Sequence, residues 1–294
     1  MTKSFGAQTA VDDLSLAVPE RTIYGFIGPN GSGKTTTLRM IMRLFQPDRG
    51  TVAVLGAPNK PAVDDRVAYL PEERGLYKQM TVSEVLEYYA ALKGMARADS
   101  RAEITRWLER LELAAHAKKR VSALSKGMSQ KVQFIATVVA RPELVLLDEP
   151  FSGLDPVNAV VLRDAILELR KTSTVIFSTH DMSAAEALCD FIFMIHRGKK
   201  VLDGTLAEIK SAYGRDTLRV KVGDGVGLDG LSGVHEVTDL GNLQELRIGE
   251  GAEPQRILRQ LLDRGDVHHF EVAQPSLHEI FVRIAKPEPE RADA

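Results

Sequence analysis

The chain has 294 residues, of which 44% are hydrophobic and 27% charged, so its composition is that of a folded protein with a sizeable core. This length exceeds what one core usually serves, which predicts one large domain and a smaller one. The net charge of −2 comes from 38 basic and 40 acidic residues, which argues against a sequence-independent grip on nucleic acid. The one cysteine, Cys189, excludes an internal disulfide and fits a reducing compartment.

Neither an export signal nor a membrane span is expected. Asp12 and Asp13 lie near the N-terminus, where a signal peptide needs an unbroken apolar stretch. Apolar runs elsewhere, such as 145–147 and 191–195, are far shorter than the ~20 residues needed to cross a bilayer. The chain is therefore not expected to span a membrane itself.

The N-terminal part begins with a strand, a loop and a helix in succession. Residues 22–27 form a compact apolar run, which is typical of a parallel strand buried on both faces. A glycine-rich turn follows, and Leu38, Ile41 and Phe45 then recur at helical spacing. A phosphate-binding loop requires this order of elements.

Residues 28–35 match the phosphate-loop pattern G-x-x-x-x-G-K-[ST]. In this pattern inward-facing backbone N–H groups and the helix N-terminus bind anions, Lys34 reaches the β and γ phosphates, and the Thr35 hydroxyl binds Mg²⁺. A chance glycine turn is the alternative, which the flanking strand and helix disfavour. The residues predicted to bind nucleotide here are Asn30, Gly31, Ser32, Gly33, Lys34, Thr35 and Thr36.

Residues 77–140 have a mostly helical pattern. Thr81 and Glu84 form a capping box ahead of an apolar run. Trp107 belongs to an apolar stripe at helical spacing, and such stripes usually face a core. We interpret the segment as a helical insertion whose stripe is core.

Two further apolar runs, 144–147 and 174–178, are separated by a helical stretch at 156–169. Strands that alternate with helices predict an α/β fold with a mostly parallel sheet. Ligands gather at the carboxyl ends of the strands in such sheets. The sequence therefore predicts a P-loop NTPase core with its site at this edge.

Asp148 and Glu149 follow the strand predicted at 144–147. Beside a phosphate loop, Asp148 is placed to hold Mg²⁺ through water, and Glu149 to orient or deprotonate the attacking water. Acids that merely cap the next turn are the alternative. That alternative weakens because a phosphate loop in the same chain needs such a partner.

The chain changes character after Lys210. Acidic residues outnumber basic ones in residues 211–294, and the reverse holds for residues 1–210. Short strands at 218–222, 243–248 and 268–272 are expected around helices at 254–262 and 276–284. We therefore divide the chain into a domain at 1–210 and a small α+β domain at 211–294.

Motifs in a characteristic order resemble the ATP-binding subunit of ABC transporters. After the phosphate loop come Leu124-Ser125-Lys126-Gly127-Met128, LVLLDEP at 144–150, Ser152-Gly153-Leu154-Asp155 and Ser178-Thr179-His180. The resemblance covers roughly residues 2–210. The set is far more specific than any one of its members.

The resemblance implies a homodimer, or a pair with a related ATPase subunit, that sandwiches two ATP molecules with Mg²⁺. Ser125 and Gly127 would bind the γ-phosphate held by Lys34 of the partner subunit, and a helix N-terminus suits that anion. Asp155 would lie in a loop that touches the opposite subunit. His180 would hydrogen-bond the γ-phosphate.

Three departures from the family pattern stand out. Glu72 replaces the usual glutamine after the strand at 67–70; a carboxylate still ligates Mg²⁺ and faces the water, but it adds negative charge beside the phosphates. Lys126 replaces a glycine of the family pattern. Its ammonium group either adds positive charge near the nucleotide or is simply exposed to solvent. Phe5 matches the aromatic that stacks on adenine, while the strand that normally precedes it is either short or upstream.

The C-terminal domain and the segments YLPEERGLY and LSKGMSQK narrow the resemblance to the sodium- or drug-export type, whose permease is a separate membrane chain. This type implies an ATPase at the cytoplasmic face of the cell membrane, peripheral through that permease. Residues 74–77 and the first helices of the insertion would receive a coupling helix of the permease. The C-terminal domain would dimerise, regulate the ATPase, or only support the catalytic domain.

Two other classes of function are weighed against an export ATPase. A soluble ABC ATPase in DNA maintenance or translation would carry long heptad coiled coils or a second ATPase domain, and neither occurs in this sequence. A non-catalytic ATP-binding regulator would be expected to lack Glu149 or His180, and both are present.

Overall fold

The computed structural model describes residues 1–58, 65–73, 75–213, 216–223, 225–249 and 251–285. Its contacts divide the chain into two compact units, Met1–Thr205 and Leu206–Ala294. The change in composition predicts a boundary after Lys210, and this residue lies inside helix α7 (Leu206–Ala212). The charge composition reflects the residues exposed on each unit and does not mark where a helix begins. The structural boundary lies at the start of α7.

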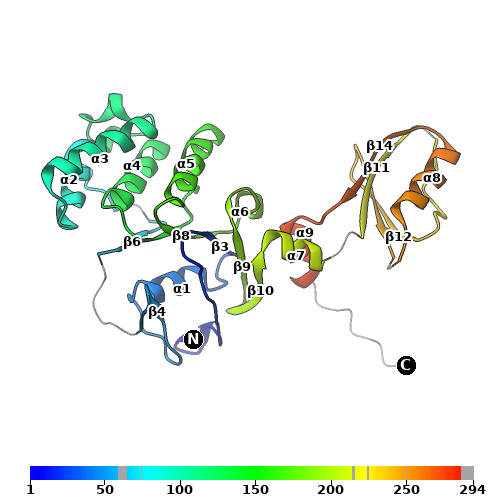
Figure 1. Cartoon of the computed structure of the whole chain (residues 1–294), viewed down its shortest axis with the longest axis horizontal. Coiled ribbons are helices and arrows are strands. Elements are labelled where there is room, and N and C mark those ends of the chain that lie inside the picture. The colour runs from blue at the N-terminus through cyan, green and yellow to red at the C-terminus, as the bar shows by residue number, and fades with distance from the viewer. Residues whose placement is uncertain (59–64, 74, 214–215, 224, 250, 286–294) are drawn as a thin grey trace. The chain divides into compact units, whose positions relative to one another are not determined.

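A six-stranded sheet forms the centre of the first unit (Figure 1). In spatial order its strands are β10 (Lys199–Thr205), β9 (Phe191–His196), β3 (Ile23–Ile27), β8 (Thr174–Thr179), β7 (Leu144–Asp148) and β6 (Val67–Leu70). Neighbouring strands from β9 to β6 are parallel, and β10 pairs antiparallel with β9 at the edge. The predicted α/β class, with a mostly parallel sheet and an antiparallel edge, is confirmed.

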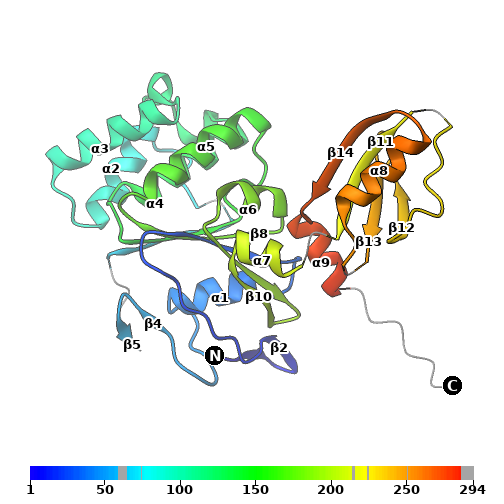
Figure 2. The same ribbon diagram turned by 45° about the vertical axis from the view of Figure 1, so that its right-hand side comes forward.

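Helices cover both faces of this sheet, which explains why every residue of β3 and β7 is buried. Helix α1 lies on one face, and α4, α5 and α6 lie on the other (Figure 2). Their bounds are α1 (Lys34–Ile41), α4 (Lys126–Val138), α5 (Pro156–Leu169) and α6 (Met182–Leu188). Tyr24, Phe26 and Phe193 fill the core on the α1 face, together with Leu38 and Leu146.

Short antiparallel strands adjoin the sheet at the start of the chain. They are β1 (Lys3–Phe5) with β2 (Gln8–Val11), and β4 (Ala53–Val54) with β5 (Ala57–Pro58). Within the described residues no strand precedes β1, and Thr2 instead forms an isolated bridge with Arg49. The backbone position of Phe5 is therefore set by the β1–β2 hairpin.

The helical insertion is confirmed, and it contains α2 (Val82–Leu92), α3 (Arg97–Arg110), the 3₁₀ turns η1 (Ala114–His116) and η2 (Val121–Ala123), and α4. The capping box predicted at Thr81 and Glu84 starts α2. Trp107 is 1% exposed and packs edge-on against Phe134 of α4, with ring centroids 5.7 Å apart. The apolar stripe of α3 is thus core.

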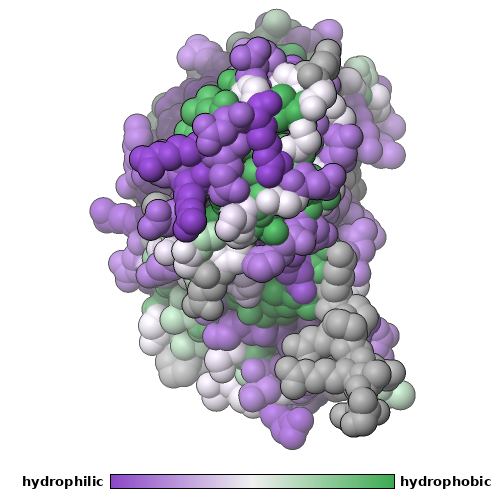
Figure 3. Space-filling model, turned by 90° about the vertical axis from the view of Figure 1, so that its right-hand side faces the viewer, coloured by the Kyte–Doolittle hydropathy of each residue, from purple (hydrophilic) through white to green (hydrophobic). Residues whose placement is uncertain are grey.

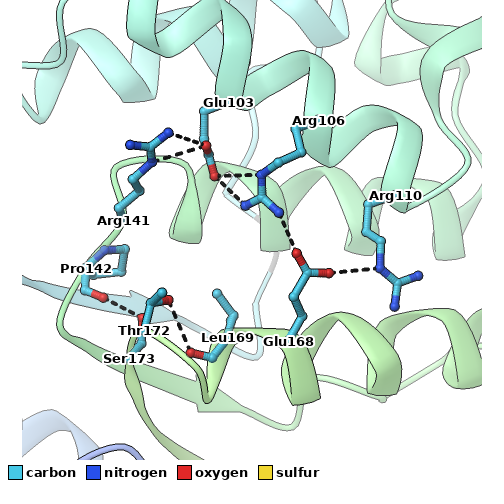
Figure 4. Close-up of polar contacts among 9 residues, drawn as sticks. All are labelled: Glu103, Arg106, Arg110, Arg141, Pro142, Glu168, Leu169, Thr172 and Ser173. Atoms are coloured by element: carbon cyan, nitrogen blue, oxygen red, sulfur yellow. Dashed lines mark hydrogen bonds and ion pairs between the residues drawn. The ribbon is translucent and has the colours of Figure 1, made fainter.

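A network of ion pairs ties α3 to α5 and to the loop after α4 (Figure 4). The Glu103 carboxylate accepts hydrogen bonds from Arg106 and, at 2.8 and 3.1 Å, from Arg141. Arg106 also donates to Glu168 at 2.6 Å, and Arg110 donates to Glu168 at 3.1 Å. Burial alone would raise the pKa of Glu103, but the two guanidinium groups outweigh it and lower that pKa.

The second unit is built on a four-stranded antiparallel sheet, in the order β12 (Val234–Asp239), β13 (Gln244–Ile248), β11 (Thr217–Val222) and β14 (Val267–Ala273). Its other helices are α8 (Pro254–Arg264) and α9 (Leu277–Ala285). Leu218 and Leu246 of the sheet form a core with Ile257 and Leu261 of α8. The predicted small α+β domain is confirmed, although β12 and α7 were not predicted. The surface seen in Figure 3 is mainly hydrophilic.

Replacing Glu103 by alanine is expected to lower the free energy of unfolding of the first unit by about 1–3 kcal/mol, because the bonds that Glu103 makes are charge-assisted. Its side chain is 4% exposed, while those of Arg106 and Arg141 are 45% and 67% exposed, so water can solvate the two guanidinium groups left behind. Urea unfolding followed by circular dichroism measures the change. Glu109→Ala, at an exposed position of the same helix, is the control, and an equal loss there would contradict the network's role.

Candidate functional site

The phosphate loop joins the end of β3 to the start of α1. Gly33 adopts φ +110°, and a Cβ there would lie 2.4 Å from the carbonyl oxygen of Ala10, so only glycine fits. The Lys34 ammonium donates hydrogen bonds to the carbonyls of Gly28 at 2.7 Å and Pro29 at 3.2 Å. The loop therefore encircles the lysine side chain at the carboxyl edge of the sheet.

Asp148, at the end of β7, is 1% exposed and accepts hydrogen bonds from three hydroxyl groups. Thr35 Oγ1 and Tyr69 OH each donate at 3.2 Å, and Ser178 Oγ donates to the same carboxylate. Burial, followed by the charge of Asp148, raises the pKa of Tyr69 to about 12, so Tyr69 remains a donor at neutral pH. The orientation of the Asp148 carboxylate is thus set from three different strands or helices.

Glu149 is the next residue, and it adopts φ +48°, a left-handed conformation that non-glycine residues rarely take. Its N–H donates to the carbonyl oxygen and to Oγ of Ser178, both at 3.2 Å, which stabilises this conformation. Its Oε1 lies 3.0 Å from His180 Nδ1 and 3.9 Å from Lys34 Nζ. Burial lowers the pKa of Lys34, and the nearby carboxylates, Glu149 foremost, oppose that shift.

Lys34, Thr35 and Glu149 line a cavity of about 400 Å³. Predicted site residues make up most of its lining, namely the nucleotide-binding candidates Phe5, Asn30, Gly31, Gly33, Lys34, Thr35, Thr36 and Glu72, and the catalytic candidate Glu149. The Phe5 side chain is 46% exposed, and its ring meets Phe45 edge-on at 5.3 Å. Ser32 is buried, and its hydroxyl has no hydrogen-bond partner among the described residues.

Six predicted site residues are not among the described residues that line this cavity. Asp148 and His180 form hydrogen bonds with the lining residues Thr35 and Glu149, Ser32 belongs to the phosphate loop, and the other three lie at the start of helices. Ser125 caps the N-terminus of α4, where its hydroxyl accepts from Met128 N–H at 3.2 Å, and Gly127 is buried in the first turn of that helix. Asp155 caps α5 and accepts from the N–H of Asn158 at 3.0 Å. All three therefore mark helix N-termini outside this chain's own cavity.

Glu72 and Lys126, the two charged residues that depart from the family pattern, have different surroundings. Glu72 lines the cavity, and its charge is one of those that act on the pKa of Lys34. Lys126 is exposed and lies along Gly153, where a Cβ would come within 2.4 Å of its Cε. Only the glutamate thus places its charge at this cavity.

Sequence reasoning missed several residues that hold the site together. Tyr69 and Ser178 orient Asp148, and the parallel register pairs Ser178 with Asp148, so a strand-end position was the available signal for Ser178. Gln130 and Gln133 of α4 are 2% and 5% exposed. Two glutamines close to the apolar residues Val132, Phe134 and Ile135 are the signal that could have marked them.

A second, mainly apolar groove of about 480 Å³ lies among the turn after α1, β6, α2 and α4. Leu44 and Leu92 line it, and they are 56% and 61% exposed. Gly75 and Tyr89 also belong to its lining. Arg74, part of the segment predicted to receive a coupling helix, lies outside the described residues.

In the part of the chain that the structure describes, no helix has both the length and the apolar character of a membrane span. The ABC transporter family matches residues 11–152, and the C-terminal domain of DrrA1-3-like ATP-binding proteins matches residues 204–285. A solved structure of an ATP-binding subunit of an ABC transporter superposes with a TM-score of 0.67 and 30% identity, covering 72% of this chain and 90% of that one.

Two curated relatives extend over nearly the whole chain. The uncharacterised ABC transporter ATP-binding protein YhaQ of Bacillus subtilis is 40% identical over 284 residues, which cover 96% of this chain and 95% of the relative. The Nod factor export ATP-binding protein I of Paraburkholderia xenovorans is 33% identical over 288 residues, covering 96% and 94%. With the phosphate loop and the paired acids in place, the chain belongs to the ATP-binding subunits of the ABC transporter family.

Proposed function

We propose that this ABC ATPase hydrolyses MgATP to drive export through a separate membrane permease. The observation that carries the proposal is that Lys34, Thr35 and Glu149 line one cavity, while the Asp148 carboxylate accepts a hydrogen bond from Thr35. Phosphoryl transfer depends mainly on positioning and on charge stabilisation, and these groups supply both. The relative named for Nod factor export supports the direction of transport.

The oxygen donors beside the phosphate loop fit Mg²⁺. This ion is usually held by one or two carboxylates, water and substrate phosphates, and the Thr35 hydroxyl and Asp148 carboxylate are adjacent, 3.2 Å apart. We assign Thr35, Asp148 and Glu72 to hold it, with Asp148 acting through water. Bound there, Mg²⁺ supplies positive charge that offsets the charge of the β- and γ-phosphates.

Glu149 is assigned as the residue that orients or deprotonates the attacking water. Its Oε1 lies 3.0 Å from His180 Nδ1, so the histidine positions the carboxylate and would present its other ring nitrogen to the γ-phosphate. Backbone N–H groups of residues 30–36 and the Lys34 ammonium bind the phosphates. Phe5 offers an exposed ring to the adenine.

A second subunit completes the site in this proposal, as a homodimer or as a pair with a related ATPase. Ser125 and Gly127 are at the start of α4, a 13-residue helix whose N-terminal N–H groups and dipole attract anions. Because they lie outside the described lining of this chain's cavity, we assign them to the γ-phosphate held by the partner. Asp155, exposed at the start of α5, would contact that subunit.

The apolar groove is assigned to the permease. Its volume and apolar lining suit a short helix, and Leu44 and Leu92 expose more than half of their surface there. Exposed apolar surface that rims a groove commonly marks a protein-interaction site. The transported substrate would bind in the permease.

Glu149→Gln is expected to slow steady-state ATP hydrolysis by about 10²–10⁴-fold, because a general base contributes that much. ATP binding should be retained, since Lys34 and the loop are unchanged. A phosphate-release assay measures the hydrolysis rate, and a nucleotide titration measures ATP binding. Light scattering measures the mass, which should double when ATP binds. Glu20→Gln, at an exposed position before β3, is the control; undiminished turnover by Glu149→Gln would remove its assigned role.

Leu92→Asp is expected to abolish association with membranes while leaving ATP hydrolysis by the purified chain within about twofold of the wild type, because a charge in an apolar contact is poorly tolerated. Co-sedimentation with membranes from cells that express the cognate permease measures the association. Leu262→Asp, on α8 of the second unit and 57% exposed, is the matched control. Equal loss in both variants, or in neither, would argue against the groove as the docking site.

A further inference from the structure

Gln133 connects helix α4 to both sides of Glu72. Its Nε2 donates a hydrogen bond to the carbonyl of Pro71 at 3.3 Å and another to the carbonyl of Glu73 at 3.1 Å. These carbonyls belong to the residues immediately before and after Glu72. One side-chain amide thus clamps the backbone from which the Glu72 carboxylate enters the nucleotide cavity.

The cost of burying this amide indicates that its donor group matters. Gln133 is 5% exposed, and its Oε1 has no partner among the described residues. A buried acceptor without a hydrogen bond is unfavourable, and an apolar side chain of the same length would avoid the penalty. The glutamine differs from such an apolar side chain by its amide N–H groups, which donate to the carbonyls of Pro71 and Glu73.

A second glutamine on the same helix makes a similar contact beside the other cavity carboxylate. Gln130 Nε2 donates to the carbonyl of Pro150 at 3.1 Å, and Pro150 directly follows Glu149. Gln130 and Gln133 are one turn apart on α4. A single helix therefore holds the backbone beside both Glu149 and Glu72. The same helix carries Ser125 and Gly127 at its N-terminus.

We propose that Gln133 is a positioning residue for ATP hydrolysis, which fixes Glu72 in the nucleotide cavity by holding the carbonyls that flank it. The inference rests on the proposed ATPase function and extends it to a residue outside the cavity. Gln133 also lines the apolar groove, so its amide spans from the groove to the loop that carries Glu72.

A double-mutant cycle tests whether Gln133 acts through Glu72. Gln133→Met keeps the length of the side chain and removes both donors, and a misplaced Glu72 should lower kcat by about 10- to 100-fold. In a Glu72→Ala background the same substitution should change kcat less than about twofold, since contacting residues that share one role are not additive. Losses that multiply in the double variant would overturn the proposal.

Amide hydrogen exchange gives a readout that does not depend on turnover. In Gln133→Met the amides of Glu72 and Glu73 should exchange faster, while those of β6 keep their rate. Gln133→Lys, which restores a donor at the same position, should recover most of kcat and of the protection. Val138→Ala, at a buried position of α4 that does not line the groove, should change neither, and it controls for packing.

The outcomes separate this inference from the proposed function. A wild-type chain that hydrolyses ATP, with Gln133→Met unchanged in kcat and in exchange, would overturn the inference alone. A wild-type chain that does not hydrolyse ATP would overturn the proposed function, and the exchange of Glu72 and Glu73 would still decide whether Gln133 holds their backbone. If Gln133→Met does not fold, Gln133→Leu, which also removes both donors, carries the same comparison.

Discussion

The hydrogen bonding of the Asp148 carboxylate is the constraint on which the site depends. Three hydroxyl groups, from Thr35, Tyr69 and Ser178, converge on it inside the protein, and each comes from a different strand or helix. Parallel pairing brings their elements to one edge of the sheet. A buried charge needs such partners, so the loop that binds phosphate and the strand that carries the acids are held in one arrangement.

That arrangement forms one side of a reaction site. The cavity contains the phosphate loop, Glu72 and Glu149, whereas Ser125 and Asp155 begin helices outside its described lining. In the proposed function, hydrolysis therefore depends on the approach of a second ATPase subunit. Coupling of this kind suits a transporter, because closing and opening of a pair can then be transmitted to a membrane chain.

Helix α4 contacts the backbone beside both cavity acids. Its buried glutamines, Gln130 and Gln133, donate hydrogen bonds to the backbone next to Glu149 and on both sides of Glu72, and Ser125 caps its N-terminus. The ion pairs around Glu103 attach the rest of the insertion to α5. The helical insertion is therefore joined to the nucleotide cavity by specific polar contacts as well as by its apolar core.

The sequence alone determined the features that local patterns encode: the phosphate loop, the acids after a buried strand, the capping box at Thr81 and the order of motifs that resembles one family. It did not reveal β12, whose exposed residues lack an apolar alternation, nor the roles of Tyr69 and Gln133. Their partners are 79 and about 60 residues away in the chain. Only the tertiary structure decided those contacts, because a hydrogen bond between distant residues depends on how the strands and helices pack and leaves no periodic signal in the sequence.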